Sequence, residues 1–234
     1  MNAPVNAQAA PAGFWQRYAA WSLDALVLLS ATLLLAWPRL QVAWNALGTA
    51  TRALVADTGQ VLADGLMSGA GLPDLTRTLL HDPRLLGAAA NVQAAWWDLS
   101  WPVLLGYALL AAVWHVGGEC SRWYGSPGKH ALGLAVTDLH GRRLSLPRAT
   151  LRHVAGLLSW LTLNLGHALA LLPPQKRTLH DYIAGTRVVR VATDPRLPRW
   201  AAAWIAVQWL ALFALLAWLL LRYVAALESG VPGL

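Results

Sequence analysis

The stretch WAAAWIAVQWLALFALLAWLLL, residues 200–221, decides the broad class of this protein. It contains a single polar side chain, Gln208, and it lies between Arg199 and Arg222. A helix of this length rises about 33 Å, which matches the roughly 30 Å hydrocarbon core of a bilayer. The stretch therefore predicts a transmembrane helix, followed by a short tail over residues 222–234.

Two further apolar runs predict two more spans. The first covers residues 18–37 after a polar tail at residues 1–13, and we expect it to end at Pro38 because proline lacks a backbone N–H donor. The second covers about residues 99–116, and several Trp residues at its entrance are typical of the bilayer interface. The three spans predict an all-α integral membrane protein, and a fourth span is considered below.

Composition supports a membrane protein and argues against a soluble one. The chain has 234 residues, of which 57% are hydrophobic and only 12% are charged, whereas soluble domains carry about 25% charged residues. The net charge is +7, but the basic residues flank the apolar runs instead of forming one stripe. We therefore expect anionic lipid headgroups, and not nucleic acid, as partners of these charges.

The connection between the first two spans, residues 38–98, carries four Arg and five Asp and should lie on the outer face. Helical periodicity runs through its first part, and residues 72–81 predict a second short helix. We expect a helical loop there. With basic segments assigned to the inside by the positive-inside rule, the N-terminus should be cytoplasmic and the protein should be a multi-pass protein of the inner membrane.

The region between the second and last spans allows two topologies. Residues 119–150 and the motif at residues 176–191 are both basic and should both be cytoplasmic, yet the apolar segment 151–172 between them could span. His153, Asn164 and His167 form a polar stripe along that segment, which is costly in lipid. We favour a membrane-embedded, re-entrant or interfacial helix, which leaves three spans; four is the alternative.

Two short β-branched runs add a constraint on this topology. Residues 132–137 and 186–191 each follow or contain a glycine and read as strands. If they pair, the segments before and after residues 151–172 must lie on one side of the membrane. We therefore expect a small cytoplasmic element with short β-strands.

Arg17 and Asp24 are the most informative charges. Seven residues make two helical turns, so both side chains lie on one face of the first span. An acid within a span is expensive and must face protein or water, so Asp24 is either a titratable functional group or a tie between helices. Arg17 could also pair with Asp181, whose simpler role would be to cap a helix.

No pattern in the chain predicts an enzyme. The adjacent His180 and Asp181 lack further ligands at metal-binding spacing, and the single Cys120 has no partner for a disulfide or a zinc site. No Ser or Cys stands in a nucleophile context. We expect no catalytic residues, no metal and no cofactor.

Three motifs occur in a fixed order along the chain. They are Phe14-x-x-Arg17-x-x-Ala20-x-x-x-Asp24, then Ser126-Pro127-Gly128-Lys129-x-x-Leu132-Gly133-Leu134-x-Val136, then His180-Asp181-x-x-Ala184-Gly185-Thr186-x-Val188-Val189. Together they resemble the RDD family of membrane proteins over residues 14–191. The resemblance implies that Arg17, Asp24 and Asp181 are the Arg and two Asp after which the family is named, with Gly128, Lys129, His180, Gly185 and Thr186 as further motif residues.

The resemblance implies little about mechanism, because the family's role is mostly unassigned. Transport of unidentified ligands is proposed, and cation/proton exchange is suggested for some members. The chain departs from many relatives in its long segment before the second span and in the span after the last motif.

Two functions therefore remain open. A transporter or ion-coupling component would use Asp24, with Arg17, Asp181, His153, Asn164 and His167 along a polar route. A scaffold or accessory subunit would use the same groups to hold helices together within a homo-oligomer or a larger membrane complex.

Overall fold

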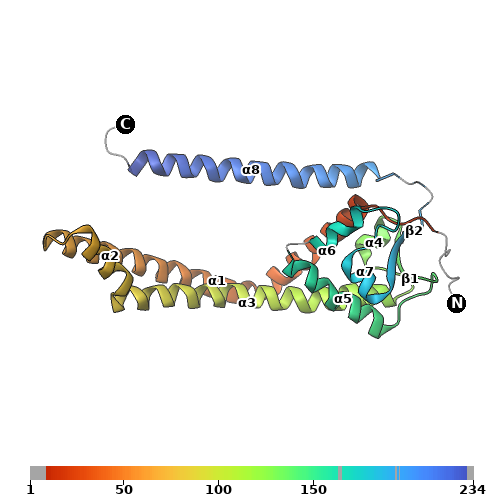
Figure 1. The fold of residues 1–234 in the computed structure, drawn as a ribbon, viewed down its shortest axis with the longest axis horizontal. Coiled ribbons are helices and arrows are strands. Elements are labelled where there is room, and N and C mark those ends of the chain that lie inside the picture. Colours follow the sequence, from red (N-terminus) through yellow and green to blue (C-terminus); the bar gives the residue numbers. More distant parts are fainter. Residues whose placement is uncertain (1–8, 163–164, 193, 195, 231–234) are drawn as a thin grey trace. The chain divides into compact units, whose positions relative to one another are not determined.

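The computed structural model describes residues 9–162, 165–192, 194 and 196–230, and these residues are mostly helical (Figure 1). The elements are α1 (Phe14–Met67), α2 (Leu72–His81), α3 (Pro83–Cys120), α4 (Pro127–Ala131), β1 (Leu134–Asp138), α5 (Leu146–Leu161), α6 (Leu165–Ala168), the 3-10 turn η1 (Leu169–Leu171), α7 (Leu179–Ala184), β2 (Thr186–Arg190) and α8 (Arg199–Gly230). Among the described residues, three helices are long and apolar enough to cross a membrane: α1, α3 and α8. The predicted all-α membrane class is confirmed.

The predicted end of the first helix at Pro38 was wrong, and the second helix begins earlier than its apolar run. α1 continues through Pro38 for 54 residues, and α3 begins at Pro83, so Pro102 lies in its interior. The Pro38 ring is exposed, so it does not disturb the packed face of α1, and one missing backbone hydrogen bond is not enough to end so long a helix. Most of the expected outer loop is thus continuous helix, although α2 has the predicted bounds.

The chain forms two compact units. The hairpin unit is Leu26–Ala111, and the motif unit combines the chain up to Ala25 with Ala112–Leu234. The helix α1 contributes to both units, because it passes from one to the other at residue 25.

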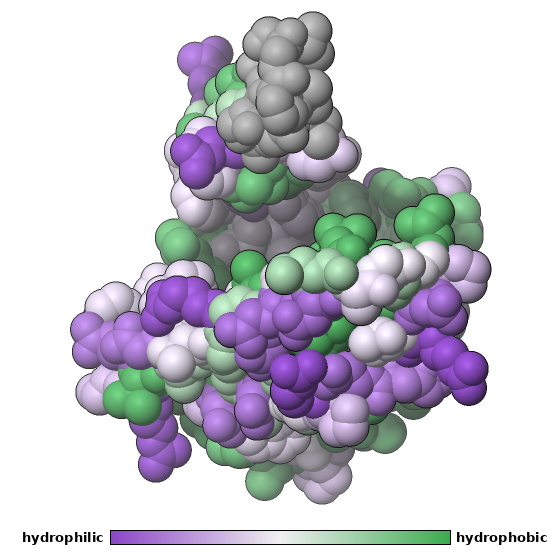
Figure 2. Space-filling model, turned by 90° about the vertical axis from the view of Figure 1, so that its left-hand side faces the viewer, coloured by the Kyte–Doolittle hydropathy of each residue, from purple (hydrophilic) through white to green (hydrophobic). Residues whose placement is uncertain are grey.

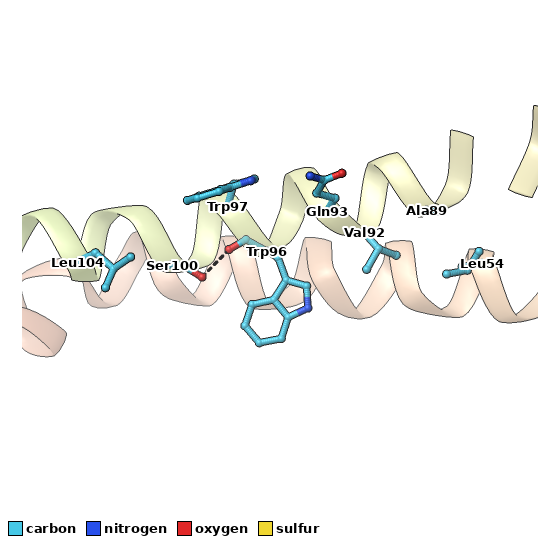
Figure 3. A pocket seen from close by; sticks show the side chains of 8 residues that line it. All are labelled: Leu54, Ala89, Val92, Gln93, Trp96, Trp97, Ser100 and Leu104. Atoms are coloured by element: carbon cyan, nitrogen blue, oxygen red, sulfur yellow. Dashed lines mark hydrogen bonds between the residues drawn. The ribbon is translucent and has the colours of Figure 1, made fainter. Parts of the chain in front are cut away.

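The hairpin unit packs through small side chains. Ala43 of α1 and Ala88 and Ala95 of α3 are buried, and a Cβ on Gly106 would lie 3.1 Å from Cγ2 of Thr32. The unit also holds an apolar groove between α1 and α3, lined in part by Leu54, Trp96, Trp97 and Leu104 (Figure 3). Close packing of small residues is a common way for membrane helices to associate without a hydrophobic driving force.

The helices of the hairpin unit are longer than a bilayer requires. The part of α1 in this unit, from Leu26 to Met67, rises about 63 Å, compared with roughly 30 Å of hydrocarbon. Part of the hairpin therefore extends outside the membrane. Seen from the end that carries α2, the surface mixes hydrophilic and hydrophobic side chains, as expected of a region in contact with water (Figure 2).

The motif unit is organised around the predicted strand pair. β1 and β2 are antiparallel, with Val136 opposite Val188, and both of these side chains are buried. Residues 10–12 extend the ladder, since the Ala12 N–H donates to the Val188 carbonyl over 3.0 Å. The core of the unit also includes Ala19 and Ala20 of α1 and residues of α8.

The segment at residues 151–172 is not one continuous helix. It comprises most of α5, then α6 and the turn η1, and it is not among the candidate spans. β1 precedes the segment and β2 follows it, and a hydrogen-bonded ladder cannot be divided by a bilayer. The strand pairing therefore favours three spans, with this segment embedded in or lying along the membrane.

Cysteine labelling tests this arrangement. In a chain with Cys120 replaced by Ser, cysteines introduced at the exposed positions Arg142 and Gln175 should show equal protection from an impermeant thiol reagent in intact cells. A cysteine at Arg77, in the exposed helix α2, should label readily, because one span separates it from either position. Labelling of Gln175 but not Arg142 would contradict the three-span topology.

Candidate functional site

Asp24 lies in the motif unit with its carboxylate buried and hydrogen-bonded at both oxygens. The residue is 2% exposed and accepts three hydrogen bonds. Trp114 Nε1 donates to Oδ1 over 2.9 Å, the Gly128 backbone N–H donates to Oδ1 over 2.8 Å, and Ser126 Oγ donates to Oδ2 over 2.5 Å. All three donors are neutral, so Asp24 is held without a counter-ion.

Asp24 takes over the task of an N-cap for α4. Ser126 is the N-cap residue and Pro127 begins the helix, but the Ser126 side chain makes no capping bond within α4. The carboxylate of Asp24 instead accepts from the free N–H of Gly128 in the first turn, where negative charge is favourable. The helix that carries the second motif is thereby fastened to α1.

Gly128 is required for this close approach. A Cβ on Gly128 would lie 2.2 Å from the Ala20 carbonyl oxygen and 2.9 Å from the Asp24 carboxyl carbon. Backbone atoms of α1 cannot move away cheaply, so any larger residue would push α4 off the first span. This steric demand explains the glycine at a position that the sequence identified only as part of a motif.

Asp181 is the centre of a second, charged cluster. It is fully buried, and Arg17 Nη1 donates to its Oδ2 over 2.7 Å, so the predicted ion pair is present. The predicted capping role is also present, because Asp181 and Thr178 form a capping box at the start of α7. Thr186 Oγ1 adds a bond of 3.1 Å to Oδ1. The two roles expected as alternatives occur together.

Arg152 connects this cluster to α3. Its Nε donates to Asp181 Oδ1 over 3.1 Å, and its Nη1 donates to Glu119 Oε1. Lys129 Nζ donates to the same Glu119 oxygen over 2.7 Å. The result is a buried chain of alternating charges, which we call the ion chain and which runs Lys129, Glu119, Arg152, Asp181, Arg17.

Sequence reasoning missed Glu119 and Arg152. They lie 33 residues apart, Glu119 at the end of α3 and Arg152 in α5, so no local spacing relates them. Glu119 belongs to the basic segment 119–150 and Arg152 to the apolar segment 151–172, and neither pattern predicts a contact between them. The one available signal was that Arg152 stands at the start of an apolar run, where a buried arginine needs an acidic partner.

His180 is held neutral beside the ion chain. Arginine can only donate, so the 3.0 Å contact from Arg152 Nη2 makes His180 Nε2 an acceptor and places the ring proton on Nδ1. Burial lowers the pKa of His180 well below its ordinary value of 6.5, and the charge of Arg152 adds to this effect. Burial alone would raise the pKa of Asp181, but Arg152 and Arg17 outweigh it and hold this pKa well below 3.8.

The remaining predicted residues lie around these two clusters. The ring of His167 meets that of His180 edge-on at 5.3 Å, and the ring of His153 stacks on His115 at 6.1 Å. Nδ1 of His167 and Nδ1 of His180 are buried without a hydrogen-bond partner in the described part of the chain. Asn164 lies outside the described residues, so the full polar stripe stays a prediction.

The last motif forms the end of α7 and the start of β2. Gly185 has a φ of 62° at the C-cap, a left-handed conformation that glycine adopts without strain. The Arg177 side chain contacts both sides of this turn. Its Nε donates to the Thr186 carbonyl, and its guanidinium lies 4.2 Å from the centre of the Tyr182 ring. In the part of the chain that the structure describes, no group of three or more His, Cys, Asp or Glu could hold a metal ion.

Removal of Arg152 should destabilise the motif unit strongly. Arg152→Gln removes the donor to Glu119 Oε1, Asp181 Oδ1 and His180 Nε2. This loss should cost about 3–5 kcal/mol of unfolding free energy. Arg148→Gln is the matched control, because Arg148 is 44% exposed and lies 3.5 Å from Asp138, so its loss should cost less than about 1 kcal/mol. Denaturation of the detergent-solubilised variants compares the two, and equal losses would contradict the ion chain.

The lowered pKa values predict that stability falls in mild acid. Below pH 6.5 the unfolded chain takes up a proton at His180 that the folded chain does not, so stability should decline from about pH 6.5 to 5 by up to ~1.4 kcal/mol per pH unit. The contribution of Asp181 is present above pH 3.8 and is lost only further into acid. His180→Gln should reduce the decline between pH 6.5 and 5 by the share of this one histidine, whereas His140→Gln, at a position 76% exposed, is the matched control and should leave the decline as in the wild type.

A comparison with known proteins matches the region that carries Asp24 and Asp181. A model of the RDD family matches residues 11–185, which contain both clusters and end just before β2. Helix α8 lies beyond the matched region. No curated protein and no solved structure matches the chain. With three apolar helices long enough to span a bilayer and a match over most of its length, the chain is a membrane protein that belongs to the RDD family.

Proposed function

We propose that this protein is a membrane scaffold or accessory subunit, in which the intramembrane acid holds helices together. The observation that carries the proposal is the environment of Asp24: three neutral donors from its own chain, on α3, at the α4 N-cap and in α4, surround the carboxylate. A carboxylate that exchanges ions with a pathway needs an open coordination position. The Asp24 carboxylate is buried, and three donors of its own chain already bond to it.

The ion chain supports the same function. Each of its carboxylates contacts two basic residues, and together they join α1, α3, α4, α5 and α7. Buried charges of this kind stabilise poorly compared with apolar packing, but they fix which segments pair, because a shifted arrangement would leave a charge uncompensated. A rigid unit with a defined shape is what an assembly platform requires.

The hairpin unit supplies a surface for assembly. It extends beyond the hydrocarbon, and large apolar side chains near the turn between α1 and α2 remain open to solvent: Met67 is 87% exposed and Leu72 is 81% exposed. We propose that a homo-oligomer or a larger membrane complex forms through this unit. The inner membrane and a cytoplasmic N-terminus are part of this proposal, on the strength of the basic segments around the strand pair.

A transporter or ion-coupling component is the second candidate. The observation in its favour is the pair of buried, unpartnered Nδ1 atoms of His167 and His180 beside the ion chain. Polar groups left without partners in a membrane protein are the groups that a moving ion or water would meet. In that function the loss of charge at Asp24 would abolish activity without changing the fold.

Two substitutions at Asp24 separate the candidates. Asp24→Asn keeps an acceptor for Trp114 and Gly128, and its amide can donate to the Ser126 hydroxyl, so stability should fall by less than about 1 kcal/mol. Asp24→Leu leaves all three groups unpartnered and should cost about 3–6 kcal/mol. The measurement is thermal unfolding of the purified protein, together with complementation of a deletion strain.

The scaffold function expects Asp24→Asn to retain both stability and complementation. A stable Asp24→Asn variant that fails to complement would contradict the scaffold and favour ion coupling. Asp57→Asn, in the hairpin unit, is the control and should resemble the wild type in both measurements.

A further inference from the structure

A pocket on the motif unit is separate from both clusters and does not enter the proposed function. It has a volume of about 350 Å³ and is formed where the start of α1 meets η1, the turn before α7 and the end of β2. Its lining includes Phe14, Trp15, Leu171, Lys176 and Arg190. Two of the ten lining residues are basic and none is acidic.

The two basic residues have no acidic partner among the described residues. Neither Lys176 nor Arg190 takes part in an ion pair there, and Nε of Arg190 is buried without a hydrogen-bond partner. This contrasts with the ion chain nearby, in which every basic side chain meets a carboxylate. An unpaired guanidinium and ammonium that share one pocket favour an anionic occupant.

Lys176 is held in place by its backbone. It has a φ of 49°, in the left-handed region that residues with a Cβ adopt only under strain. Arg17 Nη2 donates to the Lys176 carbonyl over 2.6 Å, and this bond keeps the strained residue beside the start of α1. The backbone of Lys176 is therefore held by the same arginine that pairs with Asp181.

The other walls of the pocket are aromatic and aliphatic. Phe14 and Trp15 contact each other with ring centres 5.2 Å apart, and Trp15 remains 49% exposed. Leu171 also lines the pocket and is 57% exposed. A free inorganic anion gains nothing from these side chains, whereas the glycerol and the upper acyl chains of a lipid would cover them.

The place of the pocket in the chain agrees with such an occupant. Phe14 is the first residue of α1, which is one of the three helices long enough to span, so the pocket lies at the end of a candidate span where headgroups are expected. We propose that this pocket binds the phosphate headgroup of an anionic phospholipid through Lys176 and Arg190, with Trp15 and Leu171 against its apolar part. It is a defined lipid site, distinct from the diffuse attraction of the other basic residues.

Native mass spectrometry of the purified full chain tests the proposal with lipid titrations. The probes are phosphatidylglycerol and phosphatidylcholine with the same acyl chains, and inorganic phosphate alone. The wild type should bind phosphatidylglycerol at least about tenfold more tightly than phosphatidylcholine, at roughly 1 kcal/mol for each basic residue near the phosphate. The double variant Lys176→Gln, Arg190→Gln should bind phosphatidylglycerol about 10- to 30-fold more weakly than the wild type does. Its affinity for phosphatidylcholine should not show this loss.

Two controls separate the pocket from net charge and from misfolding. Arg143→Gln with Arg148→Gln removes two exposed basic residues of the same unit and should change affinity by less than about threefold. Lys176→Arg keeps the positive charge and leaves Arg190 in place, so it should retain the binding of phosphatidylglycerol. Thermal unfolding of each variant shows whether it is folded. Equal affinity of the wild type for both lipids, or equal losses in the pocket and control variants, would overturn the proposal. Phosphate binding that depends on Lys176 and Arg190 without a preference between the lipids would show a site for free phosphate and would also overturn it.

Discussion

The motif unit depends on the buried carboxylate of Asp181. It accepts bonds from Arg17 on α1, Arg152 on α5 and Thr186 on β2, and from the Thr178 N–H at the start of its own helix. A carboxylate without solvent is tolerated only when each oxygen has donors and the charge has a counterpart. These four elements must therefore come together for any of them to be stable, which explains how a short two-stranded ladder persists without a larger sheet.

The two acids of the family name solve the problem of burial in different ways. Asp181 is surrounded by basic residues and participates in the ion chain, whereas Asp24 has only neutral donors and stands in for the cap of α4. The difference follows from location. Asp24 lies two turns further into α1 than Arg17, where an indole N–H, a hydroxyl and a backbone N–H from neighbouring segments are the available donors.

These arrangements bear on function because they show what the polar groups already do. Polar side chains also join α8 to α1: Gln208 accepts from the Tyr18 hydroxyl, and Trp204 Nε1 donates to Ser22 Oγ. Groups so engaged serve to select one arrangement of helices, as polar residues do in other bundles. Among the described residues, Nδ1 of His167 and Nδ1 of His180 are buried without a hydrogen-bond partner beside the ion chain, so a search for activity should begin there.

The sequence by itself determined the membrane class, three apolar runs long enough to span, two candidate strands at residues 132–137 and 186–191, and the resemblance to the family, because apolar length, β-branched runs and motif order are local properties of a chain. That the strands pair, over Leu134–Asp138 and Thr186–Arg190, came only from the structure. It also named Arg17 and Asp181 as a candidate ion pair, and the structure places them 2.7 Å apart. It could not set the ends of α1 and α3, since the cost of one proline is outweighed by the rest of a long helix. Nor could it find Glu119 and Arg152 as partners, or Trp114 and Ser126 around Asp24. Only the tertiary structure decided these, because a buried charge is stabilised by whichever donor the fold brings within about 3 Å, however distant it is in sequence.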